Sequence, residues 1–453
     1  MRKLFRNFYL FLAIAMLALL VGACGAPAAD TAADAATGSD TASGESAAAE
    51  TDSSDGDVFI DFWHIQNQSP EINQDAVDRF MADNPGVDVE VSVLQNDPYK
   101  TKIKVAMGAG NPPCVFLTWG GGPLYEYVKA GQAVDLTPYM DADNYKDRFV
   151  PASLSNVTFD GKIWGVPVEN SAIAVFWYNK NIFDEYGLTP PATWDELMTV
   201  AETLKENGII PFALANKTKW TSSMYYMYLV DRLGGPEVFA KAATRTGGSF
   251  EDPVFVQAGE MIQEMVNNGY FNEGFNGLDY DTGQSRQLLY SGKAAMELMG
   301  NWQLSTMRSE NPEFEADSLS FFPFPAVEGG AGDPSNVVGT VGDNYYSVSS
   351  ACPYPDQAFE MITYLIDDES IPLRAANGRI PPVKGFESDD PALQEIIDLI
   401  GSAASVQLWY DQYLPPELGE VHKDTMQSLF GLEITPEEAA TAQEEATANF
   451  YDE

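Results

Sequence analysis

Residues 25–56 of this chain offer almost nothing from which a folded core can be built. Residues 25–56 are nearly all Ala, Thr, Ser, Gly and Asp, and they contain no aromatic and no large aliphatic side chain. Such a segment cannot bury enough apolar surface to offset the entropy lost on ordering, so we expect a disordered tether. The fold must therefore come from the residues that begin at Asp57.

A short apolar run from Phe8 to Val21 precedes the tether, and Arg2, Lys3 and Arg6 precede that run. This order is typical of a secretory signal peptide, and the run is shorter than the roughly 20 residues that span a bilayer. The final Val-Gly-Ala before Cys24 resembles the bacterial lipobox, in which the peptide is cut before a cysteine whose sulfur takes up a diacylglyceride. The resemblance implies a signal peptide over 1–23 and a lipidated cysteine at the head of a tether over 24–56. An ordinary signal peptide with an incidental cysteine is the alternative.

The net charge of the chain limits the kinds of molecule that it is expected to bind. The chain has 25 Lys plus Arg against 67 Asp plus Glu, for a formal net charge of −42. This balance argues against binding to nucleic acid and against adhesion to anionic membranes, and it is compatible with neutral or cationic ligands. The stretch after Asp57 is long enough for a large core and suggests two lobes.

The body begins with a β-α-β pattern. Short apolar runs at 58–63 and 115–117 are typical of buried parallel strands, and valines alternate with polar residues over 87–93. Between the strands at 58–63 and 87–93, the spacing of apolar residues over 72–81 predicts a helix. These elements indicate an α/β protein.

Helix caps support this interpretation further along the chain. Thr193 followed by Glu196 forms a capping box that predicts a helix to Asn207. Asp252-Pro253 and Thr435-Pro436 open two more helices with the same kind of start. A helix around 359–365 follows a strand-like segment at 345–348.

Catalysis and metal binding find little support. The two histidines, His64 and His422, are too far apart in sequence to indicate a metal cluster or a catalytic triad. Residues 141–146 begin like a calcium loop but lack its glycine, so we interpret them as a polar turn. No metal and no cofactor is expected. We expect the two remaining cysteines, Cys114 and Cys352, to be separate buried thiols, although a disulfide stays possible in an exported chain.

Several strings, in order, resemble the extracellular solute-binding proteins of sugar ABC transporters. The strings are Asn111-Pro112-Pro113, Gly161-Lys162-Ile163-Trp164-Gly165-Val166-Pro167, Trp177-Tyr178-Asn179-Lys180, Pro190-Pro191-Ala192-Thr193-Trp194-Asp195-Glu196-Leu197, Met299-Gly300-Asn301-Trp302 and Gly378-Arg379-Ile380-Pro381. They run from about residue 57 to the C-terminus, which is the whole body of the chain. Cys114 departs from the pattern, since the family often has an aspartate there.

The resemblance implies a two-lobed α/β fold of the maltose-binding-protein type, which is the type II periplasmic-binding-protein arrangement. Three crossover segments would join the lobes, near 165–170, 343–349 and 378–385. One lobe would comprise 57–167 plus 346–380. The other would comprise 168–345 plus 381–453. A ligand cleft would lie between them.

A site for a sugar needs flat aromatic rings to stack on and planar polar groups to pair with hydroxyls. Places where both kinds follow the end of a strand or helix are therefore the candidates. We expect the ligand to contact Trp63, Gln66, Asn67, Trp119, Trp220, Asn301, Trp302, Asp343, Trp409 and Asp411. Trp164, Trp177 and Trp194 lie inside strand or helix motifs, and we interpret them as core residues.

The sequence thus predicts a monomeric, non-catalytic receptor that is lipid-anchored on the outer face of the cell membrane. It would capture a carbohydrate of two to four sugars and deliver it to the transmembrane subunits of an ABC importer. Two alternatives stay open: a lipid-anchored glycoside hydrolase and a receptor for a solute other than a sugar.

Overall fold

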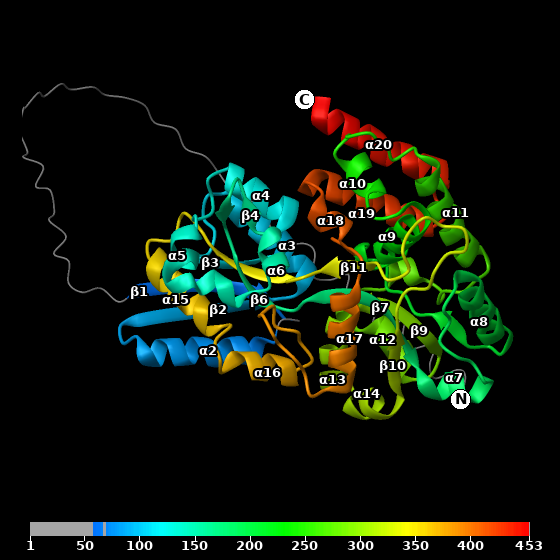
Figure 1. Ribbon diagram of the computed structural model, residues 1–453, viewed down its shortest axis with the longest axis horizontal. Helices are drawn as coiled ribbons and strands as arrows, with labels where there is room; N and C mark the ends of the chain where they lie inside the picture. Colours follow the sequence, from blue (N-terminus) through cyan, green and yellow to red (C-terminus); the bar gives the residue numbers. More distant parts are fainter. Residues whose placement is uncertain (1–57, 67–68, 453) are drawn as a thin grey trace, which may run out of the picture. The chain divides into compact units, whose positions relative to one another are not determined.

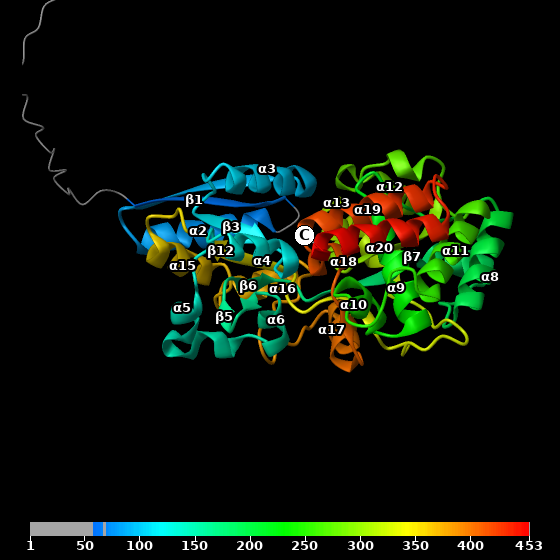
Figure 2. The ribbon, with the colours of Figure 1, turned by 90° about the horizontal axis from the view of Figure 1, so that it is seen from above.

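A computed structural model describes residues 58–66 and 69–452, which form two α/β lobes (Figures 1 and 2). The expected signal peptide, Cys24 and tether lie outside the described residues, as does Asn67. Each lobe has its own sheet and its own buried core. No helix in the described part of the chain combines the length and apolarity needed to cross a bilayer.

Lobe 1 is built on a five-stranded sheet in the order β2-β1-β3-β12-β6. Its strands are β1 (Val58–Ile65), β2 (Val87–Leu94), β3 (Val115–Thr118), β6 (Val166–Glu169) and β12 (Asn344–Val348). β1 pairs in parallel with β2 and β3, which confirms the β-α-β start, and β12 runs antiparallel to β3 and β6. β3 is buried along its whole length, whereas the edge strand β2 has one buried residue, Val89, among half-buried and exposed ones.

Helices cover both faces of this sheet. They are α2 (Pro70–Asp83), α3 (Asn96–Gly108), α4 (Gly121–Lys129), α15 (Pro355–Tyr364) and α16 (Ser370–Ala376). The short elements α5 (Thr137–Asp141), η1 (Ala142–Arg148), α6 (Pro151–Ser155), β4 (Thr158–Phe159) and β5 (Lys162–Ile163) complete the lobe. The expected polar turn at 141–146 falls in η1, which has no buried residue.

Lobe 2 is built on a six-stranded sheet around β7 (Ala172–Asn179) and β9 (Ala294–Gly300). Its other strands are β8 (Ile210–Phe212), β10 (Leu319–Phe322), β11 (Val337–Thr340) and β13 (Val406–Gln407). The main helices are α7 (Lys180–Tyr186), α8 (Trp194–Glu206), α9 (Trp220–Gly234), α10 (Val238–Ala243), α11 (Pro253–Asn267), α12 (Gln284–Tyr290), α13 (Trp302–Glu310), α14 (Pro312–Ser318), α17 (Pro391–Ser402), α18 (Tyr410–Tyr413), α19 (Pro416–Phe430) and α20 (Pro436–Asp452). The capping box of Thr193 and Glu196 is confirmed at the start of α8, and Trp177 and Trp194 are buried in the core.

The chain passes between the lobes three times, at positions slightly different from those expected. β6 still belongs to lobe 1 and β7 to lobe 2, so the first crossing is at 170–171. The second crossing, at 341–343, precedes β12, and the third follows α16. These two crossings lie within four residues of the expected boundaries after 167 and 345, at the ends of the strands β6 and β12. Strand pairing, which local sequence patterns do not report, fixes these ends.

The three crossings meet at the side chain of Asn170. Its Oδ1 accepts hydrogen bonds from the Ile380 backbone N–H at 3.0 Å and from the Asn301 amide at 3.3 Å, and its carbonyl accepts from the Asp343 N–H at 2.7 Å. The Ser171 N–H donates in turn to the Ile380 carbonyl. Asn170 is fully buried and has a φ of 48°, a left-handed conformation that Asn tolerates better than most residues.

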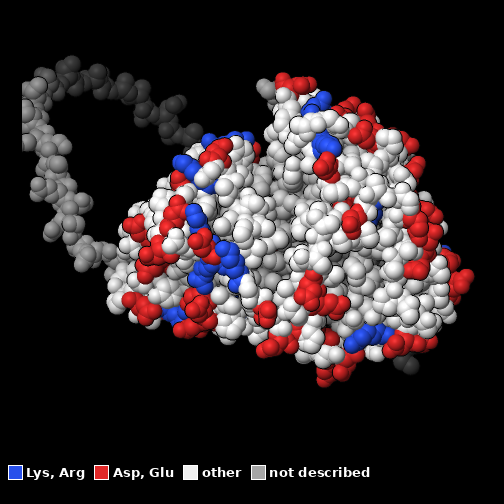
Figure 3. Space-filling model, viewed as in Figure 1, with Lys and Arg blue, Asp and Glu red and all other residues white. Residues whose placement is uncertain are grey.

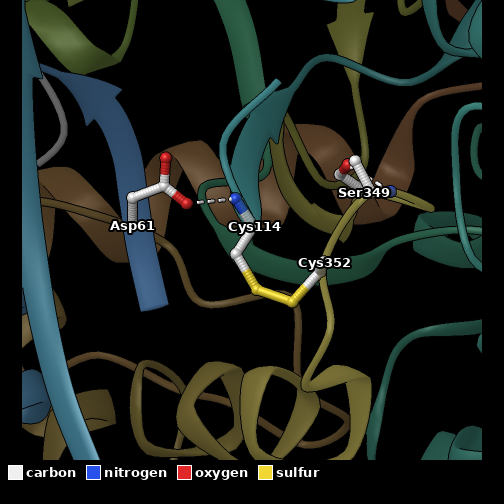
Figure 4. Close-up of a disulfide and its surroundings, with 5 residues drawn as sticks. Asp61, Cys114, Ser349 and Cys352 are labelled. Atoms are coloured by element: carbon white, nitrogen blue, oxygen red, sulfur yellow. Dashed lines mark hydrogen bonds between the residues drawn. A yellow bond between two sulfur atoms is a disulfide. The ribbon is translucent and has the colours of Figure 1, made fainter. Parts of the chain in front are cut away.

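Cys114 and Cys352 form a disulfide, so the expectation of two separate thiols is wrong. Cys114 immediately precedes β3 and Cys352 follows β12, and the antiparallel register of these strands brings their outer ends together (Figure 4). The same strand ends are tied by the Cys114 N–H, which donates to Asp61 at 2.6 Å, and by the Ser349 N–H, which donates to the Cys114 carbonyl. The apolar neighbours of each cysteine gave no sign of this pairing, because the two are 238 residues apart in sequence.

Removing the Asn170 side chain should destabilise the protein. In Asn170→Ala, the buried Ile380 N–H loses its acceptor and a Cβ-bearing residue less suited than Asn must keep a positive φ, so we expect a loss of about 2–4 kcal/mol. Asn170→Gly removes the same hydrogen bonds without the backbone strain and should lose less. Denaturant unfolding of both variants measures the difference. Equal stability of the Ala variant and the wild-type protein would contradict this role.

Candidate binding cleft

A cleft opens between the lobes, at the ends of β1 and β3, and contains about 590 Å³ of non-atom space, part of it open to solvent. Lobe 1 contributes Ile65, Asn96, Lys100 and Trp119, the second crossing contributes Asp343, and lobe 2 contributes Trp220, Met224, Met227, Tyr280, Trp302, Trp409, Asp411 and Gln412.

Four aromatic rings form the wall on the lobe 2 side. Trp220 lies 5.0 Å from Tyr280 and 6.1 Å from Trp302, measured between ring centroids, and Trp302 lies 5.7 Å from Trp409. All three contacts are edge-to-face. Trp220 and Trp302 each open a helix, α9 and α13, and Trp409 directly precedes α18. We call these four residues the aromatic wall.

Trp119 forms the opposite wall, at the end of β3. Its ring contacts Tyr99 edge-to-face at 5.9 Å, and the Lys100 ammonium lies 4.9 Å from the ring centre. The Tyr99 hydroxyl donates to the Leu117 carbonyl, which ties α3 to β3. Trp119 is therefore held in place by α3. The aromatic wall belongs to lobe 2 and Trp119 to lobe 1, so each lobe contributes aromatic rings to the cleft.

Several buried polar atoms of the cleft have no hydrogen-bond partner among the residues that the structure describes. They are the indole Nε1 of Trp220, the indole Nε1 of Trp409 and the amide oxygen of Gln412. In contrast, the Trp302 indole donates to the Tyr280 hydroxyl at 3.1 Å. A buried donor without an acceptor costs free energy, so these atoms are placed where a polar ligand would satisfy them.

Asp343 lies at the base of the cleft, where it is almost fully buried. Burial raises the pKa of its carboxyl from 3.8 to about 6, while the charge of Arg379 and a hydrogen bond from Gln412 act in the opposite direction. The Asn344 amide donates to the same carboxyl at 3.2 Å. Asp343 therefore offers the cleft an acceptor that changes charge near pH 6.

Acidic side chains of both lobes meet near the cleft. Burial raises the pKa of Asp97, and so do the charges of Asp279 and Asp411, whereas Lys100 and Lys423 lower it. Figure 3 shows acidic side chains spread over both lobes on the face that it presents. The surroundings of the cleft thus suit a neutral or cationic ligand better than an anion.

A second, polar groove adjoins the cleft and shares Tyr280 with it. Hydroxyl and amide side chains dominate its lining: Gln66, Ser69, Gln95, Ser305, Thr306, Ser309 and Asn377. Five charged side chains, those of Glu71, Asp281, Arg286, Glu310 and Arg379, also line it. We call this region the polar groove. It extends the space between the lobes beyond the aromatic wall.

The structure brings together six of the expected residues, namely Trp119, Trp220, Trp302, Asp343, Trp409 and Asp411. Gln66 lines the polar groove instead of the cleft. Trp63 lies elsewhere, with the Lys102 ammonium 3.7 Å from its ring centre. Asn301 is fully buried and bonds to the backbone of Ser171 and Ile173, so it supports the crossings and does not face the cleft.

Sequence reasoning missed Tyr280, Lys100 and Gln412. Gln412 follows Asp411 in the cluster Trp-Tyr-Asp-Gln-Tyr, so the density of polar and aromatic residues there could have indicated it. Tyr280 and Lys100 carry no such signal, because they reach the cleft only through the packing of η3 (Tyr280–Thr282) and α3.

Three glycines, Gly120, Gly121 and Gly122, follow Trp119. They begin α4, and there the backbone of α18 in lobe 2 comes close. A Cβ at Gly121 would lie 2.1 Å from the Gln412 carbonyl oxygen, and one at Gly122 would lie 2.3 Å from that of Leu414. The two lobes therefore touch where only glycine fits.

Two α/β lobes that are joined by three crossings around an aromatic cleft define a bilobal solute-binding protein. The chain belongs to the family of bacterial extracellular solute-binding proteins, whose model matches residues 65–371. It is 30% identical over 312 residues to an uncharacterized ABC transporter extracellular-binding protein of Pyrococcus horikoshii. That match covers 67% of this chain and 66% of the relative, so the chain spans about two thirds of that protein's length.

Two solved structures have the same architecture. One is associated with xylan utilization by the thermophilic bacterium Caldanaerobius polysaccharolyticus: it has 32% identity and a TM-score of 0.80, over 86% of this chain and 99% of that one. The other is a chitin oligosaccharide binding protein with 25% identity and a TM-score of 0.78, over 87% of this chain and 100% of that one. The expected two-lobed, type II arrangement is thereby confirmed.

The raised pKa of Asp343 predicts a pH dependence of stability. Because the folded protein holds this proton up to about pH 6 and the unfolded chain releases it near 3.8, stability falls as pH rises between these values. Asp343→Asn removes the effect, so the variant should match the wild-type protein below pH 4 and exceed it above pH 6 by at most about 3 kcal/mol. Thermal unfolding across this range measures the difference. Asp88→Asn, at an exposed position of β2, controls for the lost charge; a difference that is constant with pH would contradict the prediction.

Proposed function

We propose that this protein is an extracytoplasmic receptor that binds a carbohydrate of two to four sugars and delivers it to an ABC importer. The observation that carries the proposal is a pair of indole N–H groups, those of Trp220 and Trp409, in a cleft rich in aromatic rings; neither has a hydrogen-bond partner in the described part of the chain. A sugar ring has apolar C–H faces that stack on aromatic rings and hydroxyls that accept such donors. Few other neutral solutes combine both properties.

The dimensions of the site support an oligosaccharide. Two aromatic walls face each other across the cleft, and the polar groove continues from it with hydroxyl and amide side chains. A single sugar ring would not extend over both regions. Two of the similar structures point the same way, since one concerns xylan utilization and the other binds chitin oligosaccharides.

Binding would proceed by closure of the lobes. The cleft takes one wall from each lobe, so a ligand gains its full set of contacts only when the lobes are together. The crossings at Asn170 supply the hinge region, and the contact of Gly121 and Gly122 with α18 forms when the lobes meet. The importer would then recognise the closed form.

Isothermal titration calorimetry with xylo-, gluco-, manno-, galacto- and chito-oligosaccharides tests the proposal. We expect at least one series to bind, and Trp409→Ala to weaken that binding by at least about tenfold, because a buried aromatic anchor is lost. Trp63→Ala is the matched control and should leave the affinity unchanged, since Trp63 lies outside the cleft. If none of the series binds, the carbohydrate proposal fails.

The glycine contact gives a test of closure. In Gly122→Ala, the new Cβ has no room beside the Leu414 carbonyl, so the lobes cannot close fully and the oligosaccharide affinity should fall by about tenfold or more. Gly108→Ala, at the end of α3, meets open space and serves as the control. Calorimetry measures the affinity and thermal unfolding checks that both variants are folded. Unchanged affinity in Gly122→Ala would show that this contact plays no part in binding.

A receptor and a hydrolase are distinguished by the fate of the ligand. We propose that the protein is not an enzyme and returns its oligosaccharide intact. Within residues 58–66 and 69–452, no group of three or more His, Cys, Asp and Glu side chains is arranged to hold a metal ion. Chromatography of a bound oligosaccharide after prolonged incubation tests this. Shortened chains in the presence of the protein would favour the hydrolase.

We further propose that a lipid on Cys24 anchors a monomeric receptor to the outer face of the cell membrane. An anchored receptor stays at high local concentration beside its transporter, whereas a free one diffuses away. Cys24→Ala should release the protein from the membrane fraction and leave its sugar affinity unchanged. Fractionation of cells that express the two forms measures this, and retention of the variant would contradict the anchor.

A further inference from the structure

A further pocket adjoins the cleft and shares no lining residue with the polar groove. Lys100, Trp119, Asp411 and Gln412 line both the cleft and this pocket, so the two spaces are continuous around the Trp119 ring. Its remaining walls come from α3, β3 and α4 of lobe 1 and from the start of α19 in lobe 2. We call it the side pocket.

The floor of the side pocket is apolar. Ile103 and Leu117 form it and are 4% and 1% exposed, and Pro123 and Pro416 close it from the two lobes. The Tyr127 ring stands beside them and packs edge-to-face on Phe116 at 6.1 Å. A hydroxylated sugar ring on this floor would leave hydroxyls without partners, which is costly.

Three of the charged side chains that line it, Glu126, Glu420 and Lys423, take part in ion pairs. Glu420 accepts from Lys423 at 2.6 Å, and Glu126 pairs with Lys129 at 2.6 Å. The hydroxyl of Thr118, the polar side chain of β3 in this pocket, accepts the Gly120 N–H at 3.2 Å. Groups that are committed in this way offer little to additional sugar hydroxyls.

The two ends of the interlobe space thus differ in chemistry. The polar groove presents hydroxyls and amides, and the side pocket presents aliphatic and aromatic carbon. A ligand that fills both ends must itself be polar at one end and carry an apolar group at the other. An unsubstituted glycan, which has hydroxyls along its whole length, does not have this asymmetry.

We propose that the side pocket holds an apolar substituent, an acyl or aryl group, on the sugar that stacks against Trp119. The ligand class is then a substituted oligosaccharide, whose sugar chain lies along the aromatic wall and the polar groove. This inference rests on the proposed carbohydrate function. It adds that the protein discriminates substituted from unsubstituted chains of the same sugar.

Paired titrations test this preference. The probes are xylotriose, its O-acetylated form, p-nitrophenyl β-xylotrioside and xylotetraose, together with chitobiose and N,N′-diacetylchitobiose. Burial of a methyl or aryl group on the apolar floor should make a substituted member bind about fivefold or more tightly than its parent. The affinities of O-acetylated xylotriose and p-nitrophenyl β-xylotrioside, compared with each other, show which substituent fits the pocket better.

Variants locate the preference. Tyr127→Ser removes a ring from the pocket and should reduce the ratio of substituted to unsubstituted affinity towards one, whereas Tyr127→Phe should retain it. Tyr139→Ser is the matched control: this tyrosine of lobe 1 stacks on Phe359 away from the cleft, and its loss should not change the ratio. If Tyr127→Ser does not fold, the wild-type ratios still decide the question.

The outcomes separate the two proposals. Failure of every oligosaccharide to bind refutes the carbohydrate function itself. Binding of parents and substituted forms with equal affinity, or tighter binding of the parents, refutes the side-pocket inference alone. A gain for xylotetraose equal to that for the substituted trioses also refutes it, because the pocket would then be a further subsite for a plain sugar ring.

Discussion

The side chain of Asn170 is the point on which the two-lobed arrangement depends. A single amide oxygen accepts from the third crossing and from Asn301, while the adjoining carbonyl accepts from the second crossing. Nearby, the buried ion pair of Glu169 and Arg374 joins the end of β6 to α16, and the Arg374 guanidinium also donates to Asn73. Removing one partner of a buried ion pair destabilises a protein strongly, so this pair and the hydrogen bonds of Asn170 together hold the crossings in place.

This hinge explains how a cleft with incomplete hydrogen bonding is tolerated. Each lobe has its own core and its own sheet. The residues that line the cleft therefore contribute less to folding than to contacts with whatever the cleft encloses. The unpartnered indoles of Trp220 and Trp409 and the raised pKa of Asp343 are all found there. Polar groups that are left without partners at a functional site carry a cost in stability that a ligand can remove.

The chemical character of the space between the lobes also changes along its length. Hydroxyl-rich walls occupy one end, aromatic rings the centre and an aliphatic floor the other end, and residues of both lobes line all three regions. Closure therefore assembles three chemical environments in a fixed order. The contact of Gly121 and Gly122 with α18 is beside the apolar end, where a backbone approach this close excludes any larger residue.

Much of the fold was accessible from the sequence, and six of the ten residues expected to contact a ligand line the cleft. Apolar alternation and the capping box of Thr193 reported local structure, because strand and helix periods depend on near neighbours. The order of motifs indicated the family, and tryptophans beside polar residues indicated the cleft. Only the tertiary structure decided that Cys114 meets Cys352, that Asn301 serves the hinge, that Trp63 turns away and that Tyr280 joins the aromatic wall. These outcomes depend on pairing between segments more than a hundred residues apart or on how helices pack, and no local pattern in a chain records such contacts.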